Sequence, residues 1–135
     1  MPSFGASSKK SLAQAHPLLQ KLFTEVIKEY DCKVLDAQRG RAKQEEAFKR
    51  GNSRAHFGQS PHNWTPAIAL DVVPYPIDWN DLARFRKLGS IVKRKAKELG
   101  IPISWGGDWK SLKDYPHYEL DPWRTFEKKS KPFEG

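Results

Sequence analysis

The chain of 135 residues is 38% hydrophobic, enough for one core, so length predicts a single domain over residues 1–135. Its 24 lysines and arginines against 16 acidic residues give a net charge of +8, which favours an anionic partner such as nucleic acid, lipid or cell-wall polymer. The single cysteine, Cys32, excludes an internal disulfide and a thiolate metal site. No apolar run approaches the roughly 20 residues of a membrane span, and no secretory signal is visible. We therefore expect a soluble protein without stable membrane insertion.

The first half of the chain predicts two helices with a short strand between them. Residues 1–10 are expected to form a loose polar lead-in. Apolar residues recur at helical spacing over 17–30, which predicts a core-facing helix with proline in its first turn. A short, partly β-branched strand is expected over 33–36. Residues 41–50 are good helix formers, and Gly51 is a suitable C-terminal cap.

A long loop and one basic helix dominate the second half. Residues 52–67 are rich in Asn, Ser, Gly, His and Pro, which predicts a loop. The apolar run 67–73 predicts a mostly buried strand. An apolar stripe over 82–99 predicts a helix that Gly100 ends, and the opposite face of this helix is strongly basic.

Two further strands complete the expected fold. They are predicted over 101–105 and 117–120, with a glycine- and tryptophan-containing loop between them and a basic tail over 122–135 after them. Helices that precede and interrupt a small sheet indicate an α+β protein.

Two segments, one before and one after the basic helix, combine metal-ligating side chains with turn-forming neighbours. They supply His62, Asp71 and His117, the three N and O ligands that a catalytic zinc site needs beside an open position for water. Asp114, in a proline-containing turn, can approach the metal without ligating it and take the proton from that water. Each residue also has a plain structural interpretation, because Asp71 can accept hydrogen bonds from backbone amides and the histidines can be ordinary turn or partly buried residues.

These residues resemble the signature of zinc peptidases related to D-alanyl-D-alanine carboxypeptidases. Its motifs, Ser-x-His, Ala-x-Asp and Asp/Glu-x-x-His, are matched by Ser60-Pro61-His62, Ala69-Leu70-Asp71 and Asp114-Tyr115-Pro116-His117. The stretch 105–120 is similar to the C-terminal part of the phage endolysins in this group, the L-alanyl-D-glutamate peptidases. Upstream, the family's Arg, Gln, Gly and Ser run is matched by Arg39, Gln44, Gly51 and Ser53. The likeness spans residues 11–120 and leaves both tails outside.

The resemblance implies a small antiparallel sheet with helices packed around it, as in the hedgehog and DD-peptidase-like zinc peptidases. It implies that His62, Asp71 and His117 bind Zn²⁺, that Asp114 is the general base, and that Arg39 binds or polarises the substrate. Ser60 and Gln44 are then expected at the substrate site. Without the resemblance, Arg39 would be one solvated cation in a basic segment.

The spacing between the first histidine and the aspartate departs from the family pattern. The usual separation is seven residues, whereas His62 and Asp71 are nine apart in sequence. Because both flanking motifs are intact, we interpret the two additional residues as a bulge in a surface loop.

Three side chains near the motifs have alternative interpretations. Trp105 is expected in the core, and Trp109 is expected to form a groove wall that contacts substrate. Glu119 either supports a metal-bound histidine through a hydrogen bond or faces water.

The resulting hypothesis is a zinc-dependent peptidoglycan endolysin that cleaves the L-alanyl-D-glutamate bond by metal-activated water. It would act as a monomer, with no nucleic-acid partner, after synthesis in a host bacterial cytoplasm and release through a separate membrane pore. The alternatives are a D-alanyl-D-alanine carboxypeptidase, a basic nucleic-acid-binding protein or metal nuclease, and a wall-binding relative without turnover.

Overall fold

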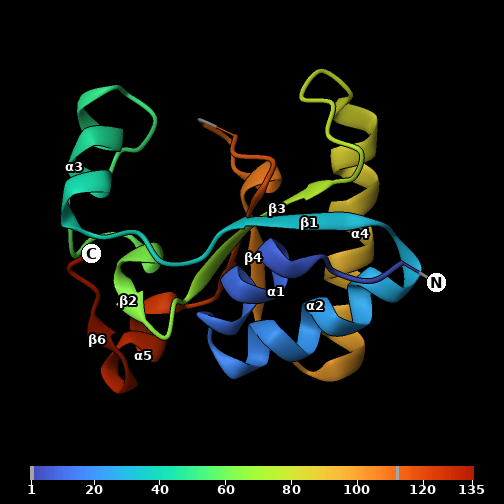
Figure 1. Ribbon diagram of the computed structural model, residues 1–135, viewed down its shortest axis with the longest axis horizontal. Coiled ribbons are helices and arrows are strands. Elements are labelled where there is room, and N and C mark those ends of the chain that lie inside the picture. The colour runs from blue at the N-terminus through green and yellow to red at the C-terminus, as the bar shows by residue number, and fades with distance from the viewer. Residues whose placement is uncertain (1, 112) are drawn as a thin grey trace.

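The computed structural model describes residues 2–111 and 113–135, and it confirms the predicted α+β class. Its main sheet is antiparallel, with strands in the order β1-β3-β5-β4 (Figure 1). These strands are β1 (Cys32–Asp36), β3 (Ala69–Pro74), β4 (Ile103–Trp105) and β5 (His117–Leu120). A second, two-stranded sheet pairs β2 (Trp64–Thr65) with β6 (Lys131–Pro132).

Two amphipathic helices, α2 (Pro17–Glu29) and α4 (Leu82–Leu99), supply much of the core and lie beside the main sheet in Figure 1. Both follow the predicted apolar stripes, because buried residues recur every three or four positions along each helix. Helix α4 ends at Gly100, which has the left-handed φ of 70° that favours glycine. At Gly89 a side chain would meet the Trp105 indole, so this glycine lets α4 approach β4 closely.

The register of the main sheet positions the functional side chains. Asp71 of β3 lies directly opposite His117 of β5. Side chains alternate between the two faces of a strand, so Tyr118 and Leu120 enter the hydrophobic core while His117 and Glu119 lie on the opposite face. The sheet therefore brings an aspartate and a histidine from distant parts of the sequence together outside the core.

The prediction of a loose lead-in over residues 1–10 is wrong. Helix α1 (Ala6–Ala13) begins within it, and Leu12 is buried against β1 and α2 neighbours in the core. The Ser8 hydroxyl, also buried, accepts a hydrogen bond of 3.1 Å from the Val34 amide. The helix has little amphipathic pattern, because only Ser8 and Leu12, one turn apart, are buried; it is stabilised by packing against β1 and α2.

The C-terminal segment is also structured rather than a tail. It forms α5 (Trp123–Phe126), a short 3₁₀ helix (Glu127–Lys129) and β6. The Phe133 amide then donates to the Asn63 carbonyl at 2.7 Å, and the Arg41 amide donates to the Glu134 carbonyl at 2.9 Å. The final residues thus lie against the start of α3 (Arg41–Lys49), which Figure 1 shows apart from the other helices.

The expected loop over 52–67 contains a 3₁₀ helix (Pro61–Asn63) and strand β2, and β3 begins at Ala69 rather than at residue 67. A third 3₁₀ helix (Gly106–Asp108) follows β4. Across residues 2–111 and 113–135, no helix combines the length and the apolar character needed to cross a lipid bilayer.

Candidate metal centre and active site

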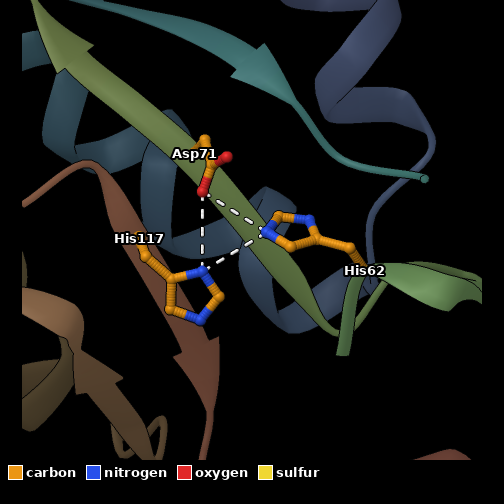
Figure 2. A group of neighbouring side chains, drawn as sticks. All are labelled: His62, Asp71 and His117. Atoms are coloured by element: carbon orange, nitrogen blue, oxygen red, sulfur yellow. Dashed lines mark hydrogen bonds and ion pairs between the residues drawn. The ribbon is translucent and has the colours of Figure 1, made fainter. Parts of the chain in front are cut away.

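The three predicted ligands meet at one point. Figure 2 shows His62, from the 3₁₀ helix before β2, facing Asp71 of β3 and His117 of β5. Nε2 of His62 lies 3.3 Å from both Nδ1 of His117 and Oδ1 of Asp71, and Nδ1 of His117 lies 3.5 Å from the same Oδ1. Both imidazoles are almost completely buried. The longer spacing between His62 and Asp71 therefore does not separate them.

Hydrogen bonds on the outer side of each ring fix the direction of its lone pair. Nδ1 of His62 is 2.8 Å from the Ala37 carbonyl, which only accepts, so the proton of neutral His62 is on Nδ1 and its Nε2 lone pair faces the centre. Nε2 of His117 is 2.7 Å from Oε1 of Glu119, which in the same way directs the Nδ1 lone pair inward. Of the two interpretations of Glu119, the structure therefore shows the hydrogen bond to the histidine.

The geometry fits a small cation. Two imidazole lone pairs and a carboxylate oxygen repel one another unless a positive charge lies between them. Oδ1 of Asp71 is buried and has no hydrogen-bond partner among the described residues. Bonds of 2.0–2.1 Å to a tetrahedral metal place neighbouring ligand atoms about 3.3 Å apart, and the observed separations are 3.3 to 3.5 Å.

Asp71 and His117 shift each other's pKa in opposite directions. Burial by itself would raise the pKa of Asp71, but the imidazoles of His62 and His117 outweigh burial and hold that pKa well below its ordinary value. Burial would lower the pKa of His117, but the carboxylates of Asp71 and Glu119 raise it to about 9. Without a metal, a proton on His117 therefore balances part of the negative charge of the Asp71 and Glu119 carboxylates.

Asp114 lies in the wall of the cavity that His62 and His117 also line. Its carbonyl accepts a hydrogen bond of 3.1 Å from the His117 amide, which ties its backbone to β5. Burial, followed by the negative charge of Asp71, raises the pKa of Asp114 above its ordinary value. A carboxylate with increased proton affinity, close to a metal site and open to a cavity, is suited to proton transfer.

Arg39 is held beside Asp71 by a buried hydrogen-bond network. One guanidinium nitrogen lies 3.8 Å from Oδ2 of Asp71, and the other donates to Oε1 of Gln44 at 3.2 Å. The Gln44 side chain is fully buried and donates to Ser53 at 3.0 Å and to the Ala55 carbonyl at 2.6 Å. Asn63 completes the network by donating to Gln44 at 3.1 Å. Gln44 thus contacts protein atoms on every side and holds Arg39 in place.

The remaining predicted site residues border a cavity of about 510 Å³. Ser60 is mostly buried, and its hydroxyl accepts from the His62 amide at 3.2 Å, so it stabilises the turn that carries a ligand. The Trp109 ring lies 5.1 Å from the His117 ring and forms part of the wall. Trp105 is buried in the core, as predicted.

Sequence reasoning missed several contributors to the site. The Ala37 carbonyl carries no side-chain signal. Asn63 is fully buried, and its side-chain oxygen accepts from the amides of Gly58 and Ser60; its place next to the histidine motif was the only available signal. Lys113 and Arg54 also line the cavity, but they resemble the many other basic residues of the chain.

This arrangement defines a class of protein. Three N and O ligands on an α+β scaffold, two of them lining a cavity next to a carboxyl group of raised pKa, are typical of a hydrolytic metal site rather than a closed structural one. The chain matches the family model described as phage L-alanyl-D-glutamate peptidase over residues 2–124, and it belongs to this family. The predicted family and enzyme class are thereby confirmed.

Individual relatives agree with this assignment. The L-alanyl-D-glutamate peptidase of Escherichia phage T5 is 33% identical over 122 residues, which cover 87% of this chain and 88% of the relative. The peptidoglycan L-alanyl-D-glutamate endopeptidase CwlK of Bacillus subtilis is 34% identical over 68% of this chain and 62% of its own length. The crystal structure of the L-Ala D-Glu endopeptidase ChiX of Serratia marcescens has a TM-score of 0.79 at 30% identity and covers 93% of this chain and 94% of that one.

Proposed function

We propose that the protein is a zinc-dependent peptidoglycan hydrolase of the endolysin type that cuts the stem peptide between L-alanine and D-glutamate. The observation that carries this proposal is the convergence of two imidazole nitrogens and Oδ1 of Asp71 at one point, with both histidines and Asp114 lining one cavity. The three similar proteins are all named for the L-alanyl-D-glutamate bond, and the Bacillus name adds peptidoglycan, which supports this substrate.

His62, Asp71 and His117 would hold the metal. Two imidazoles and one carboxylate suit Zn²⁺, because softer metals favour thiolates and Mg²⁺ or Ca²⁺ favour oxygen-only sites. Zinc in such a site is a Lewis acid that polarises a carbonyl group and makes water nucleophilic near neutral pH.

Asp114 is the general base in this proposal. It removes a proton from the attacking water and delivers it to the amine that leaves when the amide bond breaks. Its raised pKa supports both transfers, since the group must be ionised to accept the proton and must then hold it long enough to protonate the amine.

Arg39 stabilises negative charge that develops on the scissile carbonyl oxygen. Its guanidinium adjoins Asp71, so its charge lies next to the ligand set rather than in bulk solvent. Gln44 acts through Arg39 as a positioning residue, and Trp109 contributes an apolar wall against which the peptide packs. Ser60 supports His62 because its hydroxyl accepts a hydrogen bond from the His62 backbone amide.

The decisive experiment digests purified peptidoglycan with the zinc-loaded protein and identifies the fragments by mass spectrometry. We expect stem peptides with a new N-terminal D-glutamate. Loss of the reaction on chelation and its return with zinc would support the metal assignment. A stem shortened at its D-alanine end would instead indicate a carboxypeptidase, an intact wall that retains bound protein would indicate a binding relative, and cleavage of plasmid DNA would indicate a nuclease.

We also propose that the protein acts as a monomeric single catalytic domain, without a nucleic-acid partner. In this scheme it is made in the host cytoplasm and reaches the wall through a separate pore, as a phage endolysin would. The net charge of +8 supports attraction to an anionic wall. Light scattering that gave a dimer mass at assay concentration would contradict the monomer.

A further inference from the structure

Three cationic side chains line the cavity: Arg39, Arg54 and Lys113. Arg39 is engaged with Gln44 and lies near Asp71. Within residues 2–111 and 113–135, neither Arg54 nor Lys113 has a carboxylate oxygen within 4.0 Å. Two of the cationic side chains at the cavity therefore form no ion pair with the described residues, whereas Lys93, Arg94 and Lys95 of α4 each do.

Lys113 differs from an ordinary surface lysine because its ammonium group is held in place. Nζ donates to the carbonyls of Gly107 at 3.2 Å and Trp109 at 3.0 Å. The turn that supplies these carbonyls packs closely on the buried Trp105 indole, since a side chain at Gly107 would overlap that ring. An ammonium group has three N–H donors, so one remains available for a ligand at the cavity wall.

The substrate proposed above carries a negative charge close to the bond that is cut. The nitrogen of the scissile amide belongs to D-glutamate, which has two carboxyl groups. The stem continues from one of them, so the other is free and remains attached a few bonds from the leaving nitrogen. A protein group that binds this carboxylate must therefore lie near the group that protonates the leaving amine.

We propose that Lys113 binds the free carboxylate of the D-glutamate residue on the leaving-group side and makes the enzyme selective for an acidic residue there. The inference rests on the proposed function and deepens it. Lys113 directly precedes Asp114, and both line the same cavity. A held ammonium group forms a charge-assisted hydrogen bond with little loss of side-chain freedom, because its bonds to the Gly107 and Trp109 carbonyls already restrain it.

Arg54 is the competing candidate for this role. It belongs to the loop after α3, next to the Ser53 that bonds Gln44, and so lies on the side of the cavity that holds Arg39. Lys113 belongs to a different segment, the one between β4 and β5, and lines the same cavity. No hydrogen bond holds the Arg54 side chain among the described residues, so binding through it would require ordering a long side chain.

The experiment compares two synthetic stem peptides that differ at one group. In the first, L-alanine precedes D-glutamate whose free carboxylate is on Cα and whose chain continues to L-lysine from the side-chain carboxyl; in the second, that carboxylate is a carboxamide. For the zinc-loaded wild type we expect kcat/KM to be about 10- to 100-fold higher for the carboxylate peptide. In Lys113→Met the ratio should fall to within about threefold of unity, through loss of activity on the carboxylate peptide alone.

Two variants separate charge recognition from simple disruption of the turn. Lys113→Arg keeps the charge and should retain most of the selectivity. Lys110→Met removes an exposed lysine of the same loop that does not line the cavity, and it should leave both rate constants unchanged. A structural role for Lys113 would instead lower both rates equally. As a second readout, calorimetric titration of the metal-free protein with the D-glutamyl product should show weaker binding in Lys113→Met.

The outcomes are distinct. If the wild type cleaves both peptides equally, or if Lys113→Met keeps the wild-type ratio, Lys113 does not recognise the carboxylate although the proposed function stands. If Arg54→Met rather than Lys113→Met abolishes the ratio, the recognition site is on the other wall and the inference is wrong. If the wild type cleaves neither peptide, the proposed function fails, and the inference fails with it.

Discussion

Glu119 lies two residues beyond His117 on β5 and accepts from its outer ring nitrogen at 2.7 Å. Because this contact fixes the ring and its tautomer, we expect Glu119→Ala to weaken zinc affinity by about 10- to 100-fold. Glu119→Gln keeps an acceptor oxygen but loses the charge, so its affinity should be intermediate. Competition titration against a chromogenic chelator measures the change. Glu46→Gln, on the exposed face of α3, is the matched control and should bind zinc like the wild type.

The raised pKa of His117 predicts opposite pH dependences for the two metal states. In the metal-free protein, a folded pKa of about 9 against an ordinary value of 6.5 contributes stability that is complete below pH 6.5 and is lost as the pH rises through 9. The lowered pKa of Asp71 contributes stability above about its ordinary value of 3.8, which is lost only in stronger acid. Zinc binds only the deprotonated His117 ring. The stabilisation of the folded protein by zinc should therefore grow with pH over the same range in which the stabilisation by the His117 proton is lost.

Thermal unfolding with chelator and with zinc between pH 6 and 9.5 tests this expectation. The metal-free protein should lose up to about 3 kcal/mol across the range, while the difference in Tm between the two states widens. In His117→Gln both trends should flatten. A metal-free protein whose Tm rises from pH 6.5 to 9 would contradict the protonation scheme.

Asp114→Asn tests the assignment of the general base. The amide is close in size but cannot accept the proton, so kcat should fall by about 10²- to 10⁴-fold. Asp114 is not one of the three residues proposed to hold the metal, so the zinc content of the purified variant should stay at the wild-type level. Equal loss of zinc and of activity would mean that the residue ligates the metal instead.

Gln44 should affect catalysis only through Arg39. Gln44→Leu removes the partner of the Arg39 guanidinium, one of the two acceptors of the buried Asn63 amide and the donor to the Ala55 carbonyl, which should cost about 1–3 kcal/mol of folding stability. It should also lower kcat. In a double-mutant cycle with Arg39→Ala, the two effects on kcat should be strongly non-additive. Additive effects would indicate that Gln44 contacts the substrate independently.

The packing of the C-terminal segment against Gly40 gives a separate stability prediction. A Cβ atom at this position would lie 2.5 Å from the Glu134 carbonyl oxygen and from Cα of Gly135. Gly40→Ala should therefore displace residues 131–135 and lower the unfolding free energy by about 1–3 kcal/mol. Gly5→Ala, where nothing lies within 4 Å, is the control. Denaturant titration that showed equal stabilities would contradict the close packing.

The long amphipathic helices and the ligand set could be predicted from the sequence for different reasons. Helix α4 repeats its apolar residues at one period over five turns, so the local sequence pattern alone predicts which side faces the core. His62, Asp71 and His117 were recognised because each lies in a short motif with chemically distinctive neighbours. Helix α1 has no comparable pattern, because it is stabilised by contacts with β1 that are distant in sequence. Its existence could not be inferred from local spacing.

The backbone groups that contribute to the site and the pairing between distant segments could not be predicted from the sequence either. The carbonyl of Ala37 orients His62, but any residue type would supply the same group. Strand β6 is two residues long and pairs with an equally short β2, so neither carries a strand pattern of its own. Glu119 remained ambiguous until the register of β5 placed it on the same face as His117.

The site divides into parts with different tolerance to sequence change. Asp71 and His117 are fixed by the register of adjacent strands, whereas Arg54, Trp109 and Lys113 come from connecting loops. Loops accept insertions and replacements far more readily than paired strands. Replacement of residues in the loop between β4 and β5 other than Asp114 is therefore a route to lytic enzymes directed at differently decorated bacterial walls, with the ligand set and the general base retained.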